Sequence, residues 1–372
     1  MKAEHLYIHV PFCARRCVYC DFSIAVRSRV PVDEYLEALE REWAIRHGDS
    51  VFELDTVYLG GGTPSKLGGE GVARLFDLVR RNAKLREDAE VTLEANPEDV
   101  SPDSVRAWRA AGVNRVSLGV QSFDDAVLAW MHRTHDAEQA RRAVKVLREH
   151  GIDNLSIDLI FGAPSSIQRS WERDLDTALD LELPHVSAYG LTVEQHTPLG
   201  RWVARKDLSE APEDAFEHEY LEADSRLTAA GFQHYEVSNY GMLNQHSRHN
   251  WAYWRRSAYA GLGPSAHEFD GHARRWNSDA YAHWVARLSR REDPVGGSEE
   301  LSADQETAEE VYLSLRTNAG LKVSPPEQDH VDRWIDAGWA SLGSDSRLRL
   351  SGTGWLRLDA LACDLTMLRS RY

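Results

Sequence analysis

The feature that most restricts the fold of this sequence is a regular alternation of short apolar runs and longer amphipathic segments up to about residue 245. This is the pattern of repeated strand–helix units, in which helical crossovers join parallel strands. Six successive units without a dinucleotide-binding glycine pattern favour a barrel-like sheet over an open one. The sequence therefore predicts an α/β fold built on a (β/α)6 partial barrel. The expected strands are Leu6–Val10, Thr56–Leu59, Glu90–Glu94, Arg115–Gly119, Asn154–Phe161 and Val186–Leu191.

A helical segment follows each expected strand. The first begins near Val32, the second near Glu70, and the third at the start signal Ser101-Pro102-Asp103, where proline suits the first helical turn. The later helices are expected at Asp124–Met131, Ala137–His150, Gln168–Leu181 and Pro212–Ala230.

The composition changes towards the C-terminus, and three domains are expected. Residues 1–230 form the barrel, and 231–295 form an ordered segment rich in Trp, Tyr, His, Asn and Arg that packs on it. Gly296-Gly297-Ser298 is interpreted as a linker to residues 300–372. This last part is expected to be winged-helix-like, with helices Ala303–Arg316 and Pro326–Ala337 and a hairpin from Arg347–Leu350 to Trp355–Leu358.

The charge balance and hydropathy exclude several classes of function. The formal net charge is −16, with acidic residues spread along the chain, so the average field repels phosphate backbones and no nucleic-acid partner is expected. No run of about 18 apolar residues occurs, and the N-terminus lacks the basic and apolar regions of a signal peptide. We therefore expect a cytoplasmic protein whose membrane contact is at most peripheral.

Three of the four cysteines, Cys13, Cys17 and Cys20, fall within eight residues. Thiolates at such spacing are typical metal ligands, and Arg15 and Arg16 between them are expected to lower the thiol pKa values. A structural zinc site needs four ligands, and only His9 is available as a fourth. A [4Fe-4S] cluster on three thiolates instead leaves one iron open for another ligand. The fourth cysteine, Cys363, is expected to be a small buried hydrophobe.

This loop, Cys13-x3-Cys17-x2-Cys20 with Tyr19 before the last cysteine, resembles the signature loop of the radical S-adenosylmethionine (SAM) superfamily. The resemblance implies a radical SAM (β/α)6 partial TIM barrel, in agreement with the strand pattern. It also implies that the three cysteines are the metal ligands of a [4Fe-4S] cluster. SAM would chelate the open iron and be cleaved by one electron to a 5′-deoxyadenosyl radical.

Further polar and glycine-rich motifs follow the later strands, where such sheets place their ligand sites. The segment Gly60–Pro64 begins with three glycines. Because glycine lacks a Cβ atom, their backbone amides are expected to approach a ligand closely. Glu94 ends the third strand, Gln121 closes the fourth, and Arg133 follows the next helix. Asp158 interrupts an apolar strand and needs a specific partner there. An internal polar network across the barrel is the alternative for Gln121, Arg133 and Asp158.

Longer segments resemble the oxygen-independent coproporphyrinogen III oxidase family over nearly the whole chain. They are Leu6–Cys13, Tyr19–Phe22, Gly60–Pro64, Gly119–Phe123, Asp158–Gly162 and Tyr235–Asn239. Carried over residue by residue, the resemblance implies contacts with one or two SAM molecules from Tyr7, Tyr19, Gly61, Gly62, Thr63, Glu94, Gln121, Arg133 and Asp158. The chain departs from the family pattern around Arg133, in Met131–His135, and in the turn Gly162–Ser165.

Two branches of this family can be distinguished by features of their sequences. The dehydrogenases carry another cysteine two residues after the last ligand and a long N-terminal extension, whereas this chain has Phe22 and only twelve residues before Cys13. The haem chaperones carry a His-Asn-x-x-Tyr-Trp motif, present here as His249–Trp254. The resemblance implies that His249, Asn250, Tyr253 and Trp254 bind haem, with imidazole as axial ligand and aromatic rings against the macrocycle. His246 and His267 are weaker candidates.

The expected function is therefore that of a haem chaperone that binds a [4Fe-4S] cluster, SAM and haem and passes haem to an acceptor, such as a respiratory haem protein. No catalytic residue is assigned. The alternatives are an oxygen-independent coproporphyrinogen III dehydrogenase, a radical SAM methyltransferase or cyclopropanase, and a binding module stabilised by zinc.

Overall fold

The computed structural model describes residues 3–48, 50 and 52–370. Its main sheet has the strand order β14-β13-β12-β11-β1-β4-β5-β6-β7-β8-β10-β9. From β11 to β8 all neighbours are parallel, and antiparallel strands extend the sheet at both ends. The parallel strands are β1 (His5–Val10), β4 (Phe52–Gly61), β5 (Ala83–Ala95), β6 (Arg115–Gln121), β7 (Asn154–Phe161), β8 (His185–Gly190) and β11 (Tyr259–Leu262).

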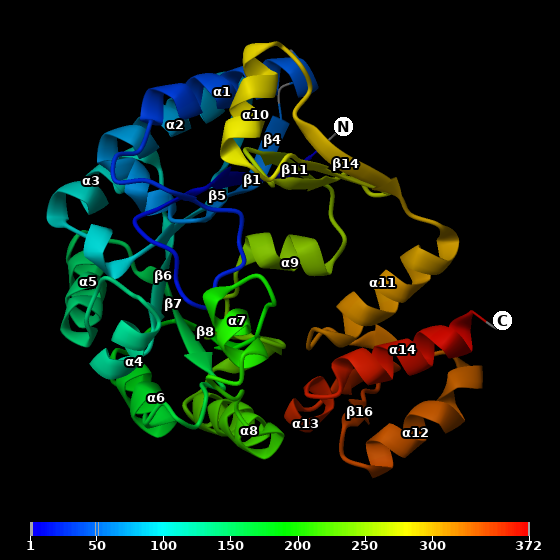
Figure 1. The fold of residues 1–372 in the computed structure, drawn as a ribbon. Helices are drawn as coiled ribbons and strands as arrows, with labels where there is room; N and C mark the ends of the chain where they lie inside the picture. Colours follow the sequence, from blue (N-terminus) through cyan, green and yellow to red (C-terminus); the bar gives the residue numbers. More distant parts are fainter. Residues whose placement is uncertain (1–2, 49, 51, 371–372) are drawn as a thin grey trace.

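The sheet curves into an open barrel, with a row of helices around its outside (Figure 1). Ser101, Asp124, Asp136 and Ser170 cap the starts of four of them with their side chains. All six expected strands are present, and so are the expected helices. They are α1 (Val32–Arg46), α2 (Gly68–Asn82), α3 (Pro102–Ala111), α4 (Asp125–Trp130), α5 (Ala137–Glu149), α6 (Trp171–Asp180) and α8 (Glu213–Ala229). A further short helix that was not expected, α7 (Pro198–Ala204), precedes α8.

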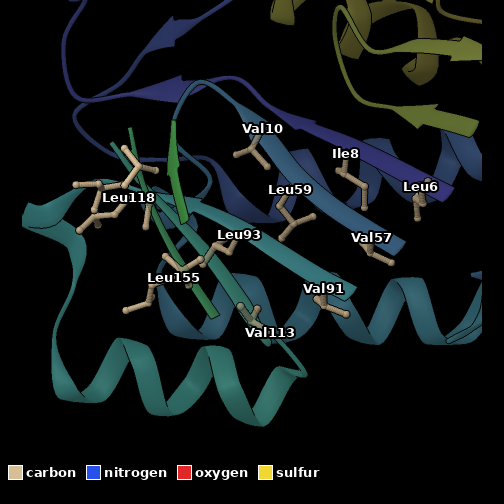
Figure 2. Close-up of a cluster of buried hydrophobic side chains, with 14 of the residues drawn as sticks. Leu6, Ile8, Val10, Val57, Leu59, Val91, Leu93, Val113, Leu118 and Leu155 are labelled. Carbon is tan, nitrogen blue, oxygen red and sulfur yellow. The ribbon is translucent and has the colours of Figure 1, made fainter. Parts of the chain in front are cut away.

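The alternation of side chains along the strands separates an apolar core from a polar interior. Leu6, Ile8 and Val10 of β1 are buried in the cluster that Figure 2 shows, next to Val57 and Leu59 of β4. The residues between them point to the opposite face of the sheet, because the side-chain period of a strand is two. That opposite face carries the polar groups, including Tyr7, His9, Tyr58, Glu94 and Asp158.

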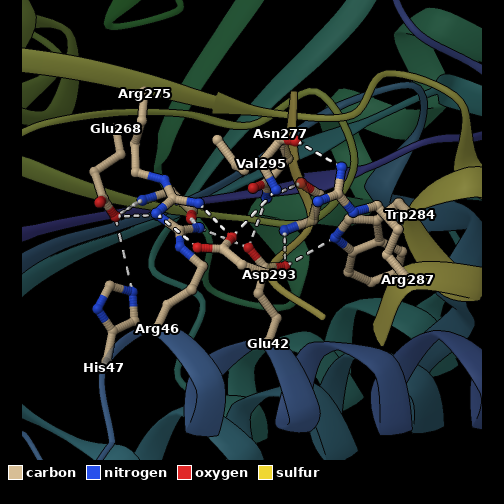
Figure 3. Close-up of polar contacts among 12 residues, drawn as sticks. Glu42, Arg46, His47, Glu268, Arg275, Asn277, Trp284, Arg287, Asp293 and Val295 are labelled. Carbon is tan, nitrogen blue, oxygen red and sulfur yellow. Dashed lines mark hydrogen bonds and ion pairs between the residues drawn. The ribbon is translucent and has the colours of Figure 1, made fainter. Parts of the chain in front are cut away.

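A buried carboxylate joins helix α1 to the antiparallel extension of the sheet (Figure 3). Glu42 accepts hydrogen bonds from Arg46, Asn277, Trp284 and the backbone nitrogen of Gly263, at 2.6 to 3.0 Å. All four lone-pair positions of the carboxylate are thus used, and the buried charge is paired. The extension consists of β12 (His267–Phe269), β13 (Ala273–Asn277), α10 (Tyr281–Ser289) and β14 (Val295–Glu300).

Two expectations for the C-terminal half are wrong. Gly296-Gly297-Ser298 is not an irregular linker, because it lies in β14 and pairs antiparallel with β13. Leu350 does end a strand, β17 (Arg347–Leu350), but its hairpin partner is β16 (Ala340–Leu342). Residues 355–358 instead end the short helix α13 (Gly352–Trp355) and begin α14 (Leu358–Arg369).

The remaining C-terminal elements form a helical layer with a small sheet. Helices α11 (Ala303–Leu315) and α14 lie side by side, and α12 (Gln328–Asp336) lies next to them (Figure 1). The small sheet has the order β15-β17-β16, with β15 at Leu321–Lys322. The domain boundaries expected from the sequence stay predictions, although the main sheet runs on from the barrel through β14.

The aromatic-rich segment also supplies β9 (Gln233–Glu236), β10 (Asn239–Gly241) and α9 (Arg248–Trp254). Helix α9 lies inside the curve of the sheet rather than outside it (Figure 1). In the described part of the chain, no helix is both long and apolar enough to cross a lipid bilayer.

Candidate functional site

A cavity of about 490 Å³ lies at the carboxyl ends of the parallel strands, where barrels of this kind place their ligand sites. Eleven of the residues predicted for the cluster and SAM line it. They are Cys13, Cys17, Tyr19, Cys20, Gly61, Gly62, Thr63, Glu94, Gln121, Arg133 and Asp158. The fold thus brings side chains from six different segments of the chain to one place, which we call the barrel-mouth cavity.

The cysteine loop is fixed at its base and at its tip. Strand β2 (Phe12–Cys13) pairs with β3 (Ala25–Val26) and closes the loop at the base. At the tip, the backbone of Val18 contacts Met131 and Leu199 through hydrogen bonds of 3.4 and 2.9 Å. The three thiols are free and half-buried, and all border the cavity. The loop is therefore held open towards the cavity by its backbone.

The charges around the thiols differ from the expectation. Arg15 and Arg16 donate to backbone carbonyl groups, of Arg133 and Cys20, rather than to thiols. Burial raises the pKa of Cys13 to about 11 and also raises the pKa of Cys20, so the expected lowering is wrong for these two. Metal coordination would be needed to keep them as thiolates.

A single zinc ion finds no support among the described residues, where no three His, Cys, Asp or Glu side chains gather closely enough to hold one ion. The three thiols fit a larger group better, because they border one cavity from a single loop. Arg133 borders the same cavity, and its Nη1 lies 3.7 Å from the sulfur of Cys17.

Arg133 is held by the protein on its other side. Its Nη2 donates to Asn96 Oδ1 at 2.6 Å and to the carbonyl of Gly119 at 2.7 Å. A Cβ at Gly119 would come within 3.1 to 3.3 Å of the polar ends of Gln121, Asn96 and Arg133. Glycine is needed here because three side chains converge over the backbone. Sequence reasoning missed Asn96, which had no signal beyond its place after Glu94.

Gln121 has a left-handed backbone, with φ of 73°. The register with β7 shifts between Gly119 and Gln121, so the strand contains a bulge at its end. The conformation is costly for a residue with a side chain, and such strain clusters at ligand sites. The bulge directs the amide of Gln121 towards the cavity.

The structure requires glycine at positions 61 and 62 for a different reason from the one expected. A Cβ at Gly61, where φ is +112°, would meet the ring of His9 at 2.5 Å, and one at Gly62 would meet the backbone of Pro11 at 2.6 Å. The amides of both glycines already donate within the protein, to Glu94 and to the carbonyl of Val10. The glycines therefore allow close packing against the end of β1, and they do not present these two amides to a ligand.

Two carboxylates border the cavity in environments that disfavour their charge. Burial raises the pKa of Glu94 to about 7, although Tyr58 and the backbone of Gly61 donate hydrogen bonds to it. Burial likewise raises the pKa of Asp158 to about 6. The specific partner expected for Asp158 is present, since Ser117 donates to it at 3.0 Å. Both groups can exchange a hydrogen bond or a proton with a ligand near neutral pH.

Tyr7 is not brought to this cavity. Its hydroxyl hydrogen-bonds with His9 Nδ1 at 3.1 Å, and its ring stacks on that of Tyr58 at 6.1 Å. It lines a second cavity instead. Tyr189, which no sequence motif indicated, borders the barrel-mouth cavity with 40% of its surface exposed.

The residues predicted to bind haem are arranged differently from the expectation. His249 is fully buried, and its two ring nitrogens hydrogen-bond with Thr56 at 2.6 Å and Tyr253 at 2.9 Å. Burial lowers its pKa to about 3. The structure therefore does not present His249 as a free axial ligand, because both nitrogens already have partners. Of the other three, Tyr253 and Trp254 line the second cavity, whereas Asn250 lies in the first turn of α9.

Comparisons with known proteins identify the family. The sequence model of the Radical SAM superfamily matches residues 7–178. "Heme chaperone HemW" of Mycobacterium tuberculosis is 39% identical over 367 residues, which are 96% of this chain and 93% of that protein. The protein of the same name from Bacillus subtilis is 35% identical over 319 residues, which are 85% of this chain and 84% of that protein. The chain belongs to the HemW family. The predicted resemblance to the chaperone branch is thereby confirmed.

A solved structure of another protein shares the fold of this chain over nearly its whole length. Coproporphyrinogen III oxidase (HemN) from Escherichia coli, a radical SAM enzyme, superposes with a TM-score of 0.81 over 97% of this chain and 90% of its own. The two sequences are 23% identical, so the likeness establishes the fold alone. The predicted radical SAM partial barrel with a C-terminal helical part is confirmed. The roles of the individual site residues of this HemW-family chain stay predictions.

Proposed function

We propose that the protein is a haem chaperone that carries a [4Fe-4S] cluster and SAM at the mouth of its barrel and transfers haem to an acceptor protein. The name of the curated relatives, heme chaperone HemW, supports the haem function. The observation that carries the cofactor part is the convergence of three free thiols with the guanidinium of Arg133 and the carboxylates of Glu94 and Asp158 on the barrel-mouth cavity.

Cys13, Cys17 and Cys20 would hold the cluster and leave one iron for the amino and carboxylate groups of SAM. When bound, the cluster supplies the electron that cleaves SAM. Arg133, fixed by Asn96, keeps a positive charge next to the sulfur of Cys17.

The remaining side chains of the cavity would hold the organic part of SAM. Glu94 and Asp158 accept hydrogen bonds from hydroxyl or ammonium groups when ionised, and Glu94 is already oriented by Tyr58. Gln121 offers an amide that can donate and accept. These groups come from β5, β6 and β7, so the sheet sets the shape of the site.

The acceptor would be a haem protein, such as one of the respiratory chain, reached from the cytoplasm or at a membrane surface. Anaerobic reconstitution tests the proposal in one preparation. We expect about four irons and four sulfides per chain, a cluster spectrum that changes when SAM is added, and stoichiometric haem uptake. Haem should then move to an apo-cytochrome, as followed by absorbance.

Cys17→Ser should lose the cluster. Cys363→Ser on α14 provides the matched control, because this cysteine lies outside the site and is exposed, so the expectation that it is buried is wrong. A cluster that survives in Cys17→Ser contradicts the ligand assignment. Turnover of coproporphyrinogen by the same preparation, without transfer of haem, would favour the dehydrogenase alternative and overturn the chaperone proposal.

A further inference from the structure

A second cavity of about 430 Å³ lies between α9, the β12–β13 hairpin and α11. It shares no lining residue with the barrel-mouth cavity. Tyr7 and Tyr58 stack at the boundary, since Tyr7 lines this cavity and Tyr58 donates to Glu94 of the other. The size lies within the range of small-molecule and cofactor sites. We call it the His267 cavity, after the histidine of β12 that borders it.

The walls of the His267 cavity are mostly aromatic. Tyr253 and Trp254 come from the end of α9, Phe269 comes from β12, and Tyr259 comes from β11. Leu313 of α11 adds an aliphatic side chain. Flat apolar walls with a few polar groups suit a large planar ligand, because ring faces bury its surface without specific hydrogen bonds.

Among the imidazoles that line this cavity, His267 is the one with free nitrogens. Both nitrogens of His9 are engaged, with Tyr7 at 3.1 Å and the carbonyl of Ser23 at 2.9 Å. His267 is exposed, and neither of its ring nitrogens has a hydrogen-bond partner within the described ranges. Its ring stacks on Trp276 at 5.6 Å. Burial and the charge of Arg274 lower its pKa, which favours the neutral form that binds metals.

Two guanidinium groups border the same cavity. Arg256 and Arg274 both lie over the ring of Phe269, at 5.7 and 5.4 Å, and both pair with Glu309 of α11. Arg256 also lies 3.9 Å from Glu306, and Arg274 lies 3.6 Å from Glu299. Because they converge on one carboxylate, they lie close to each other. A pair of guanidinium groups is the chemistry that recognises a ligand with two carboxylates.

Two donors on residues that line the cavity are unsatisfied. The indole nitrogen of Trp254 and Nη2 of Arg256 are buried and have no hydrogen-bond partner among the residues described, although Nη2 lies 3.9 Å from a carboxylate oxygen of Glu306. Buried donors normally have a partner, so the wall of the cavity contains hydrogen-bonding groups that the protein itself does not fully use.

We propose that haem binds in the His267 cavity, with His267 as the axial ligand of the iron and Arg256 and Arg274 as partners of the two propionates. The proposal rests on the haem function proposed above and locates its site. Haem brings what the cavity lacks: a planar apolar ring, an iron that accepts a neutral imidazole, and two carboxylates.

The His-Asn-x-x-Tyr-Trp motif then has a divided role. Tyr253 and Trp254 form part of the wall, whereas His249 is a positioning residue that holds the hydroxyl of Tyr253 at 2.9 Å. The buried pair of His249 and Thr56 ties this helix to β4. The motif thus builds the cavity, and the iron ligand comes from the neighbouring hairpin.

Haem titration of the cluster-loaded protein tests the site. His267→Ala should weaken binding about tenfold or more and change the absorption and EPR spectra of the ferric complex, because an axial ligand is lost. Added imidazole should restore the parent spectrum. His272→Ala is the matched control, since this histidine lies in the same hairpin with 89% of its side chain exposed. His249→Ala should weaken haem binding, because Tyr253 loses its partner, but the haem that binds should keep a histidine-ligated spectrum.

A parent spectrum in His267→Ala without imidazole, or loss of histidine ligation in His249→Ala alone, overturns the inference but leaves the haem function standing. Failure of the parent protein to bind haem overturns the haem function itself. The dimethyl ester of haem, which lacks free propionates, tests the arginines. The parent should prefer haem to the ester, and Arg274→Ala should lose that preference; an unchanged preference contradicts the assignment.

Discussion

Glu94 shows how the barrel interior alters a single carboxylate. Its pKa is raised to about 7 in the folded protein because burial disfavours the charge. The folded state therefore binds more protons than the unfolded state between pH 4.5 and 7, and stability must fall as pH rises through this range. For a fully shielded group, a pKa shift of this size corresponds to about 3 kcal/mol of unfolding free energy. We expect a pH-dependent loss of about 1 to 2 kcal/mol, because Glu94 borders a cavity that admits water.

The change to test is Glu94→Gln, which cannot ionise. Its amide oxygen can accept from the backbone of Gly61, and its NH2 group can donate to the hydroxyl oxygen of Tyr58. Urea denaturation of the cluster-free protein at pH 5 and pH 8 should show a smaller loss of unfolding free energy in the variant than in the parent. Equal losses in the two proteins would mean that Glu94 does not titrate in this range.

Single residues also show where sequence reasoning about the site succeeds and where it stops. The cysteine spacing and the motifs at strand ends predicted eleven lining residues of the barrel-mouth cavity, because parallel strands end at a common edge. The motif around His249 indicated residues that the structure places on one helix, α9, but neither that helix nor the orientation of His249 was predicted. Whether a histidine faces a cavity or Thr56 depends on contacts 193 residues apart, and no local pattern encodes them.

At the scale of elements, helix α1 is attached to the β11–β14 extension by one buried carboxylate. Glu42→Ala would leave Arg46 with one carboxylate partner, Glu268, and would remove the acceptor of Asn277 and Trp284. We expect a loss of about 3 kcal/mol or more in the free energy of unfolding, since buried donors would lose their partner. Chemical denaturation measures it.

Glu37→Ala on the same helix provides the control. This residue pairs with Arg41 at 3.3 Å, with 65% of its side chain exposed, so its loss should change stability by no more than about 0.5 kcal/mol. Similar effects of the two substitutions would show that the network around Glu42 does not hold the extension in place.

The elements differ in how well the sequence predicts them. Strand Asn154–Phe161 is an apolar run between clear helix signals, and its predicted bounds match the structure to the residue. Strand β14 was interpreted as a linker because Gly296 and Gly297 favour irregular backbone, yet its pairing with β13 overrides that preference. A Cβ at Gly297 would meet the ring of Trp276 at 2.4 Å, so the glycine serves a cross-strand contact that the sequence does not show.

At the scale of the whole molecule, Glu309 connects the C-terminal helices to the sheet. It pairs with Arg256 after α9 and with Arg274 of β13, the two arginines proposed to hold the propionates of haem. Carboxylates of haem and of Glu309 would then compete for the same guanidinium groups. Haem binding would therefore weaken the attachment of α11 to β13, and hydrogen exchange in α11 should increase when haem is added.

The competition predicts an unusual result for Glu309→Gln. Removing this charge leaves Arg256 with Glu306 at 3.9 Å and Arg274 with Glu299 at 3.6 Å, so both guanidinium groups are less strongly held. Haem affinity should therefore rise about tenfold while the protein itself becomes less stable. Glu310→Gln is the matched control, because it removes the same charge from the next, exposed position of α11. Titration of haem and of its dimethyl ester separates the effects, since only free propionates compete with Glu309. An increase that is equal for both ligands would place the propionates away from these arginines, whereas an increase for haem alone would connect cargo binding to the position of α11.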